Sequence, residues 1–249
     1  MKKLSHRIIP NISVDCVVFG FDSEKLNVLL VERKLDVPED NVHISDYSLT
    51  GYHIFEDEDL DTAAARILKD LTGLDNIYLE QFYTFGGLQR VASDKDQLWL
   101  KYLNMGFADR IVTVGYYSLI DCSKVTLSKT EKNAQWMPVE KLDELEFAFD
   151  HREIIDKALE ALRKKVRMEP VAFELLPDRF TLTQLQKVFE SILGIKYDKR
   201  NYRKKINQMP FIVPLNEKQK GVSHKPAQLF IFSPDIFSTI KKNSHDQLF

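Results

Sequence analysis

The chain has 249 residues, of which 44% are hydrophobic and 29% charged, with a formal net charge of −2 at pH 7. This length exceeds that of most single cores and indicates two domains, and the composition is typical of a globular protein rather than a low-complexity chain. The apolar runs are only as long as strands and the two cysteines are Cys16 and Cys122, so we expect no signal peptide, no membrane span and a cytoplasmic protein with free thiols.

The first third of the chain predicts two strands, a loop and a helix. Residues 13–21 and 26–32 are rich in β-branched and aromatic side chains and are separated by a turn-prone segment. Residues 36–47 contain several Asp, Pro and Asn residues, and we interpret them as a loop. Residues 60–73 predict a helix that ends at Gly73. Its apolar face consists of Leu60, Ala64, Ile67, Leu68 and Leu71.

Further strands and a second helix complete the N-terminal half. Residues 76–86 and 110–120 are dense in β-branched and aromatic side chains, and a strand within 134–142 ends at a proline. Residues 151–166 predict an amphipathic helix that can connect this half to the next, with Asp150 as its cap. Strands combined with two helices in this order predict an α+β domain.

The C-terminal part begins with two helices. Thr181 and Gln184 have the spacing of a capping box at the start of a helix over 181–194. A second helix is expected over 198–209, where Asp198 is placed to act as the N-cap. The two helices are separated by a short turn, which is the arrangement of a helix-turn-helix.

A hairpin follows the two helices, and the charge of the chain changes in this region. Strands are expected at 211–215 and 227–232, on either side of a polar loop that contains lysines. Helix, turn, helix and hairpin in this order predict a winged helix-turn-helix. Residues 163–249 contain 17 Lys and Arg against 8 Asp and Glu, a net of +9, so the remainder has 18 against 29, a net of −11. Such a division favours a polyanionic partner for the C-terminal part.

One face of the helix over 198–209 is cationic and carries amides, whereas Tyr202, Ile206 and Met209 form the opposite, apolar face. This geometry suits a recognition helix in the major groove of double-stranded DNA, with flanking lysines on phosphates. The alternatives are a solvated amphipathic helix and an RNA-binding or protein-interaction module. The candidate DNA-binding residues are Lys199, Arg200, Asn201, Arg203, Lys204, Asn207, Lys218, Lys220 and Lys225.

Residues 51–74 resemble the Nudix box, whose pattern is Gly-x5-Glu-x7-Arg-Glu-U-x-Glu-Glu-x-Gly-U, with U an aliphatic residue. When the pattern is aligned on Gly73, its arginine matches Arg66 and its first glutamate matches Glu58. Gly51 stands one residue too early. The positions of the three helical glutamates are occupied by Ile67, Asp70 and Leu71.

The departures from this pattern argue against catalysis. Nudix enzymes hydrolyse diphosphates with divalent metal ions, which require several oxygen ligands in close geometry. One aspartate with Glu58 is too few, and Ile67 is expected to pack against the strands instead. We therefore expect no enzymatic activity, no bound metal and no cofactor. The alternative is a Nudix nucleotide-diphosphate hydrolase with unusual ligands.

Three further runs resemble the Nudix-related transcriptional regulators of the NrtR type. They are Glu-Leu-Glu-Phe-Ala-Phe-Asp-His at 144–151, the stretch at 175–194 that begins Leu-Leu-Pro-Asp-Arg-Phe-Thr-Leu, and Asp-Lys-Arg-Asn-Tyr-Arg-Lys-Lys at 198–205. The resemblance covers about residues 8–235. It implies a Nudix-like α/β/α sandwich that binds an effector, a winged helix that binds a palindromic operator, and a homodimer. We place the domains at 1–150 and 169–249, with a linker helix at 151–168.

Some regulators of this family respond to ADP-ribose-like nucleotides, whereas others resemble regulators of sugar catabolism. A neutral sugar requires carboxylates, amides and an aromatic face, whereas a diphosphate favours clustered basic residues. Because the N-terminal half is acidic, we favour a regulator of L-arabinose utilisation and keep an ADP-ribose-sensing repressor of NAD metabolism as the alternative. The candidate effector-binding residues are Arg33, Asp36, His53, Glu56, Tyr83, Gln97 and Trp99.

Overall fold

The computed structural model divides into two units, and residue contacts place the division inside one helix. It describes residues 7–38, 42–73, 77–102, 110–122, 125, 133–223 and 225–241. The first unit comprises Met1–Gly20 and Asn27–Ala161, and the second comprises Phe21–Leu26 and Leu162–Phe249. Among the described helices, none is long and apolar enough to span a membrane.

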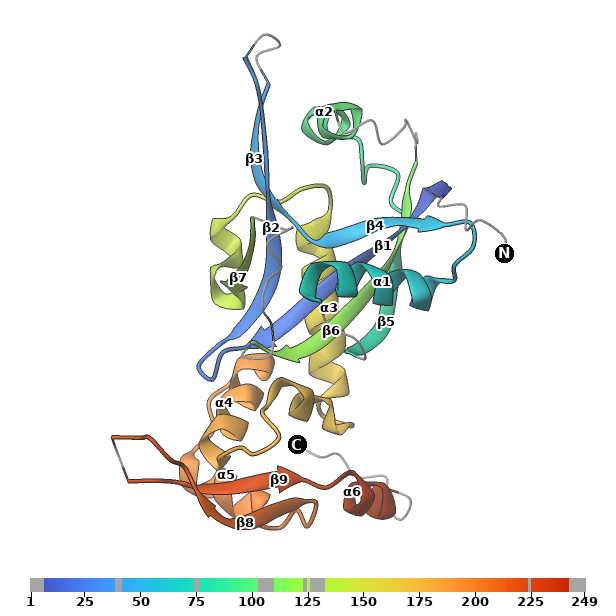
Figure 1. Ribbon diagram of the computed structural model, residues 1–249. Helices are drawn as coiled ribbons and strands as arrows, with labels where there is room; N and C mark the ends of the chain where they lie inside the picture. Colours follow the sequence, from blue (N-terminus) through green and yellow to red (C-terminus); the bar gives the residue numbers. More distant parts are fainter. Residues whose placement is uncertain are drawn as a thin grey trace. The chain divides into compact units, whose positions relative to one another are not determined.

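The first unit is built on a seven-stranded sheet (Figure 1). Five strands follow the order β3-β2-β1-β6-β5, while β4 pairs with β1 and β7 pairs with β2. The strands are β1 Ile8–Phe21, β2 Leu26–Val37, β3 Val42–Ser48, β4 Thr50–Phe55, β5 Tyr78–Phe85, β6 Val112–Asp121 and β7 Ala134–Pro138. The sequence therefore identifies five strands of this unit, namely β1, β2, β5, β6 and β7, and misses β3 and β4.

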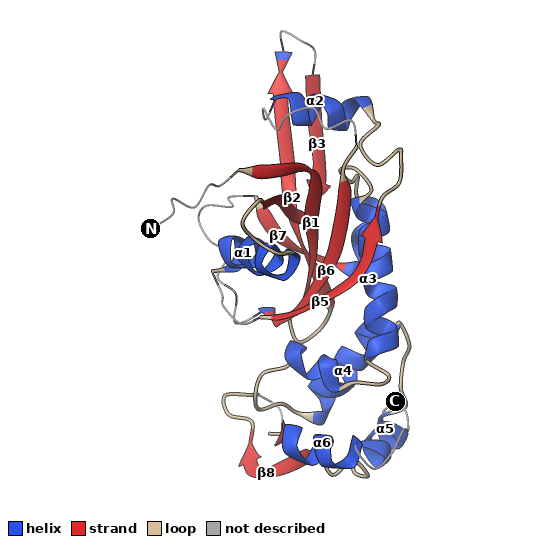
Figure 2. Ribbon diagram, turned by 90° about the vertical axis from the view of Figure 1, so that its right-hand side faces the viewer, coloured by secondary structure: helices blue, strands red, loops and turns tan. Residues whose placement is uncertain are grey.

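Helix α1 (Leu60–Thr72) packs one face of this sheet and follows the predicted periodicity. The side chain of Asp59 accepts a hydrogen bond from the Thr62 amide, and Gly73 ends the helix with a φ of 71°. Ala64 and Ile67 of the helix lie in the same buried cluster as strand residues of β1 and β6. Helix α3 (His151–Lys165) lies on the other side of the sheet (Figure 2). The predicted α+β sandwich is thus confirmed.

The loop expected at 36–47 is wrong. Strand β2 continues to Val37, and β3 pairs with it in an antiparallel register from Val37–Val42 to Val31–Ser48. The side chains of β3 alternate between buried and exposed positions, with Val42 and Ile44 buried. An alternating pattern with one buried face is sufficient for a strand, and the Asp, Pro and Asn residues near the turn concealed it.

The second unit contains the predicted helices and hairpin. Helix α4 (Leu182–Leu193) begins with the capping box of Thr181 and Gln184, and α5 (Lys199–Ile206) begins with Asp198 as N-cap. Strands β8 (Ile212–Lys218) and β9 (Gln228–Phe232) pair antiparallel. The winged-helix prediction is confirmed. Two helices that the sequence did not indicate, α2 (Asp94–Tyr102) in the first unit and α6 (Pro234–Lys241) in the second, complete the fold.

Candidate functional site

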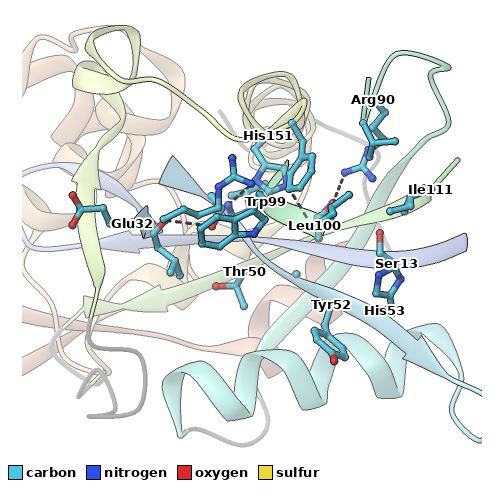
Figure 3. A pocket seen from close by; sticks show the side chains of 18 residues that line it. Ser13, Glu32, Thr50, Tyr52, His53, Arg90, Trp99, Leu100, Ile111 and His151 are labelled. Atoms are coloured by element: carbon cyan, nitrogen blue, oxygen red, sulfur yellow. Dashed lines mark hydrogen bonds and ion pairs between the residues drawn. The ribbon is translucent and has the colours of Figure 1, made fainter. Parts of the chain in front are cut away.

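A pocket of about 550 Å³ opens on the first unit (Figure 3). Its walls come from β1, from the adjoining parts of β2, β3 and β4, from α2 and the segment before it, from Ile111 before β6, and from the start of α3. This volume lies in the range of small-molecule sites. The charged side chains among its described lining residues are two carboxylates and two guanidinium groups, namely Asp15, Glu32, Arg33 and Arg90.

Arg33 is a buried cation in the second half of β2. Its Nε and Nη2 donate to the two oxygens of Asp46 at 2.7 Å each, and Nη2 also donates to Asp96 at 2.9 Å. Its guanidinium carbon lies 4.8 Å from the ring centre of Trp99 and 4.9 Å from that of Phe149. Two carboxylates and two aromatic rings therefore hold this side chain in one orientation.

Asp46, the partner of Arg33, also interacts with a second cation. Lys95 lies with its Nζ 2.6 Å from Oδ2 of Asp46. Burial alone raises the pKa of Asp46, but hydrogen bonds from Arg33 and Lys95 outweigh it, and the pKa of this carboxyl lies below its ordinary value. Asp46 is therefore ionised at neutral pH.

Arg90 is the second buried cation of the pocket. Its Nη2 donates to Asp15 at 2.8 Å, and its Nε donates to both oxygens of Asp150 at 3.0 and 2.9 Å. Burial lowers the pKa of Arg90, but the coulombic interactions with Asp15 and Asp150 outweigh it and raise this pKa above its ordinary value. Each pocket arginine is thus shared by two carboxylates.

Two histidines of the pocket are neutral at physiological pH, because burial lowers the pKa of both His53 and His151. Nδ1 of His151 accepts a hydrogen bond from the Leu49 amide at 2.9 Å. By contrast, three buried polar atoms at the pocket have no hydrogen-bond partner: Nη1 of Arg33, Nδ1 of His53 and Oγ1 of Thr50. Such atoms are rare in folded proteins and suit hydrogen bonds to a bound molecule.

The structure brings together three of the seven predicted effector-binding residues. Arg33, His53 and Trp99 line the pocket. The other four are exposed and lie outside the pocket lining: Asp36, Glu56, Tyr83 and Gln97. Asp36 pairs with His43 at 2.8 Å, and Glu56 pairs with Arg7 at 3.4 Å. The side chains of these two residues therefore pair with other surface groups.

Sequence reasoning missed Asp15, Arg90, Asp150 and His151. Asp150 stands at the expected cap position of α3, where its carbonyl oxygen accepts a hydrogen bond from the Ile154 amide at 3.1 Å, whereas the described hydrogen bonds of its carboxylate come from Arg90. His151, the next residue, lines the pocket. The adjacent Asp150 and His151 are the one signal in the sequence that could have indicated these two positions.

The residues aligned with the Nudix box form packing contacts and an ion pair. Glu58 accepts hydrogen bonds from Arg66 at 2.9 and 2.6 Å, and this contact lowers the pKa of Glu58. Ile67 is 5% exposed in the core, as predicted, whereas Asp70 is exposed. The side chain of Leu71 lies outside the described residues. No cluster of three potential metal ligands occurs among the residues described.

The cationic face of α5 is exposed in the second unit. Tyr202 and Ile206 are 3% and 1% exposed and face the core, as the helical wheel predicts. Tyr197 packs its ring 5.2 Å from that of Tyr202. The nine candidate DNA-binding residues are all exposed, on α5, at its C-cap Asn207, at the end of β8 or in the following loop. Their contacts with DNA remain a prediction.

Comparisons with known proteins match both units. A family profile described as NUDIX domain matches residues 10–158, and one described as NrtR DNA-binding winged helix domain matches residues 172–232. The Acinetobacter baylyi protein named ADPR responsive transcriptional repressor NtrR is 29% identical over 227 residues, which cover 90% of this chain and 82% of that protein.

Solved structures with the same fold agree with these matches. The structure of Shewanella oneidensis NrtR complexed with a 27mer DNA is 27% identical, with a TM-score of 0.69, and the match covers 91% of this chain and 95% of that one. A MutT/nudix family protein from Enterococcus faecalis is 22% identical with a TM-score of 0.63, over 93% of this chain and 90% of that one. The second likeness concerns the fold alone.

Proposed function

The chain belongs to the Nudix family and has the two-domain architecture of the NrtR-type transcriptional regulators, and on this premise we propose that it is a repressor that binds operator DNA and senses ADP-ribose. The observation that carries the DNA-binding part is α5, a capped helix with a buried apolar face and an exposed cationic one. In winged-helix proteins such a helix enters the major groove.

Within this proposal, the exposed residues of α5 read base edges and the lysines near the hairpin contact phosphate. Arg200 and Arg203 provide forked donors suited to guanine, and Asn207 carries an amide suited to adenine. Lys218 and Lys220 provide positive charge near the hairpin loop. The protein acts as a homodimer on a palindromic operator, because two-fold symmetry in the protein matches two half-sites.

ADP-ribose replaces L-arabinose as the favoured effector. The Acinetobacter baylyi relative is named for its response to ADPR, and this name does not support the preference for a pentose. The acidic charge that favoured a sugar belongs to the N-terminal half as a whole, whereas the pocket itself contains Arg33 and Arg90 beside the carboxylates of Asp15 and Glu32. Trp99 and the unpartnered donors add the aromatic and polar groups that a nucleotide requires.

DNA binding is tested by fluorescence anisotropy with a fragment that the protein selects from a random DNA library. Arg203→Ala should weaken binding about tenfold, as expected for loss of one base or phosphate contact. Lys157→Ala removes the same charge from α3 in the first unit, at an exposed site, and is the matched control. Equal affinities of wild type and Arg203→Ala for the selected fragment would contradict the proposal.

The effector is tested by isothermal titration calorimetry with ADP-ribose and, separately, L-arabinose. We expect saturable binding of ADP-ribose and a matching decrease in affinity for the selected DNA. Binding of L-arabinose alone would restore the regulator of arabinose utilisation as the better interpretation.

We propose further that the Nudix domain does not hydrolyse its ligand. Ile67 is packed in the core where the family pattern has a carboxylate, and Glu58 is engaged by Arg66. Incubation with ADP-ribose and Mg²⁺, followed by chromatography, should leave the nucleotide intact. Release of AMP that Asp70→Asn abolishes would show that the domain is an enzyme.

A further inference from the structure

The consecutive residues Phe149 and Asp150, just before α3, both contact residues of the pocket or their partners. The amide of Phe149 donates to Asp96 at 3.1 Å, and its ring lies over the guanidinium of Arg33. Phe149 has a φ of 48°, in the left-handed region that non-glycine residues rarely adopt. Surrounding contacts therefore hold this residue in an unfavourable conformation directly before the helix.

Asp150 is the next residue and is held by Arg90. The Arg90 side chain is 5% exposed and the Asp150 side chain 18% exposed, and their hydrogen bonds measure 2.9 and 3.0 Å. Asp150 lies outside the pocket lining, whereas Arg90 and its second partner Asp15 are part of it. Arg90 thus has one carboxylate partner within the pocket and another at the first residue before α3.

The charges of the pocket predict competition for Arg90. Asp15 and Asp150 already compensate this guanidinium, and Asp46 and Asp96 compensate Arg33. A diphosphate that enters this pocket would meet both arginines already engaged by carboxylates. It gains a strong contact only if an arginine leaves one of these partners, because phosphate oxygens and carboxylates accept from the same donors.

We infer that ligand phosphate draws Arg90 away from Asp150 and that this exchange of partners releases the start of α3. The inference rests on the proposed ADP-ribose response and adds how the pocket controls DNA binding. The remaining partner, Asp15, keeps its place on β1 inside the pocket. Asp150 is a positioning residue, since it acts through Arg90 and does not line the pocket.

Helix α3 carries the change toward the DNA-binding unit because it is continuous from His151 to Lys165. Its residues to Ala161 belong to the first unit, and those from Leu162 belong to the second. There, Nε of Arg163 donates to the carbonyl oxygen of Ile192 in α4 at 2.8 Å. Because α3 makes contacts at both of its ends, a loss of contacts at its first residues also affects the contacts that its last residues make.

The test compares Asp150→Asn with Asp143→Asn in the whole chain of 249 residues. Asp143 lies in the 3-10 turn Val139–Glu144 and forms an ion pair of 2.7 Å with Arg152 of α3, but the side chain of Asp143 is 86% exposed and does not line the pocket. Operator affinity is measured for each protein with and without ADP-ribose. Wild type and Asp143→Asn should lose about tenfold or more in affinity when the ligand is added, whereas Asp150→Asn should change by less than about twofold.

Two further measurements distinguish a positioning role of Asp150 from a purely structural one. Asp150→Asn should bind ADP-ribose about threefold or more tightly, because Arg90 no longer has to leave a carboxylate. In the wild type, ADP-ribose should increase hydrogen exchange at the amides of the first turn of α3. Asp150→Glu keeps the carboxylate, so its operator affinity should decrease on addition of ADP-ribose nearly as much as that of the wild type. This variant serves as the test protein if Asp150→Asn does not fold.

The outcomes distinguish this inference from the proposed function. A wild-type protein whose operator affinity ignores ADP-ribose contradicts the proposed function. A wild type that responds, together with an Asp150→Asn variant that responds equally, overturns the inference alone. Unchanged exchange at the start of α3 on ligand binding overturns it as well.

Discussion

Replacement of Arg33 by methionine should strongly destabilise the first unit. Arg33 is 3% exposed, and its hydrogen bonds of 2.7, 2.7 and 2.9 Å reach carboxylates whose side chains are at most 4% exposed. Removal of one member of a buried ion pair costs about 3–5 kcal/mol, because the other member remains buried without its counter-ion. In this variant Asp46 still has Lys95 at 2.6 Å, and Asp96 still has the hydroxyl of Ser93 as a hydrogen-bond partner. We therefore expect a loss at the lower end of this range, about 3 kcal/mol of unfolding free energy.

Urea denaturation followed by circular dichroism measures this loss. The control is Lys34→Met at the next position of β2, where Nζ pairs with Glu32 at 2.8 Å but the lysine side chain is 62% exposed. Exposed pairs contribute about 1 kcal/mol at most, so the control should unfold near the wild-type concentration of urea. A cost below about 1 kcal/mol for Arg33→Met would refute the reasoning that these charges depend on one another.

Three other predictions concern single groups. The free energy of unfolding should decrease as pH falls below about 4.5, because Arg66 lowers the pKa of Glu58 in the folded state and protonation of Glu58 removes this ion pair. Glu58→Gln should reduce this pH dependence in acid titrations. Tyr202→Phe should leave the melting temperature unchanged or raise it, since the buried hydroxyl of Tyr202 has no hydrogen-bond partner. Asp198→Ala should cost about 1 kcal/mol in urea denaturation through loss of the α5 cap, while Asp235→Ala in α6 serves as a surface control.

The second unit could be predicted almost completely from the sequence because its signals are local. A capping box three residues apart and an N-cap aspartate fix where α4 and α5 begin. The apolar spacing of Tyr202 and Ile206 fixes which side of α5 is buried. These interactions lie within one or two turns, so no knowledge of the rest of the fold is required.

The pocket could not be predicted in the same way, because its interactions join distant residues. Arg90 lies 75 residues from Asp15 and 60 from Asp150, in a segment before α2 that carries no periodic pattern. Arg33 was identified as a candidate, but its partner Asp46 lay in the segment interpreted as a loop. The pairing of β2 with β3 places Arg33 opposite Asp46, and that register is a property of the sheet.

Residues aligned with the Nudix box stabilise one wall of the pocket. Arg66 donates to Glu58 and to the carbonyl oxygen of His53, and its guanidinium carbon lies 4.1 Å from the ring centre of Phe55. His53 is a pocket residue of β4, so the pair holds this strand against α1. Ile67, on the same helix, fills the core where a metal ligand would stand in the family pattern. The helix that carries the Nudix-box residues thus has a structural role beside the pocket, because it holds β4 through Arg66 and contributes Ile67 to the core.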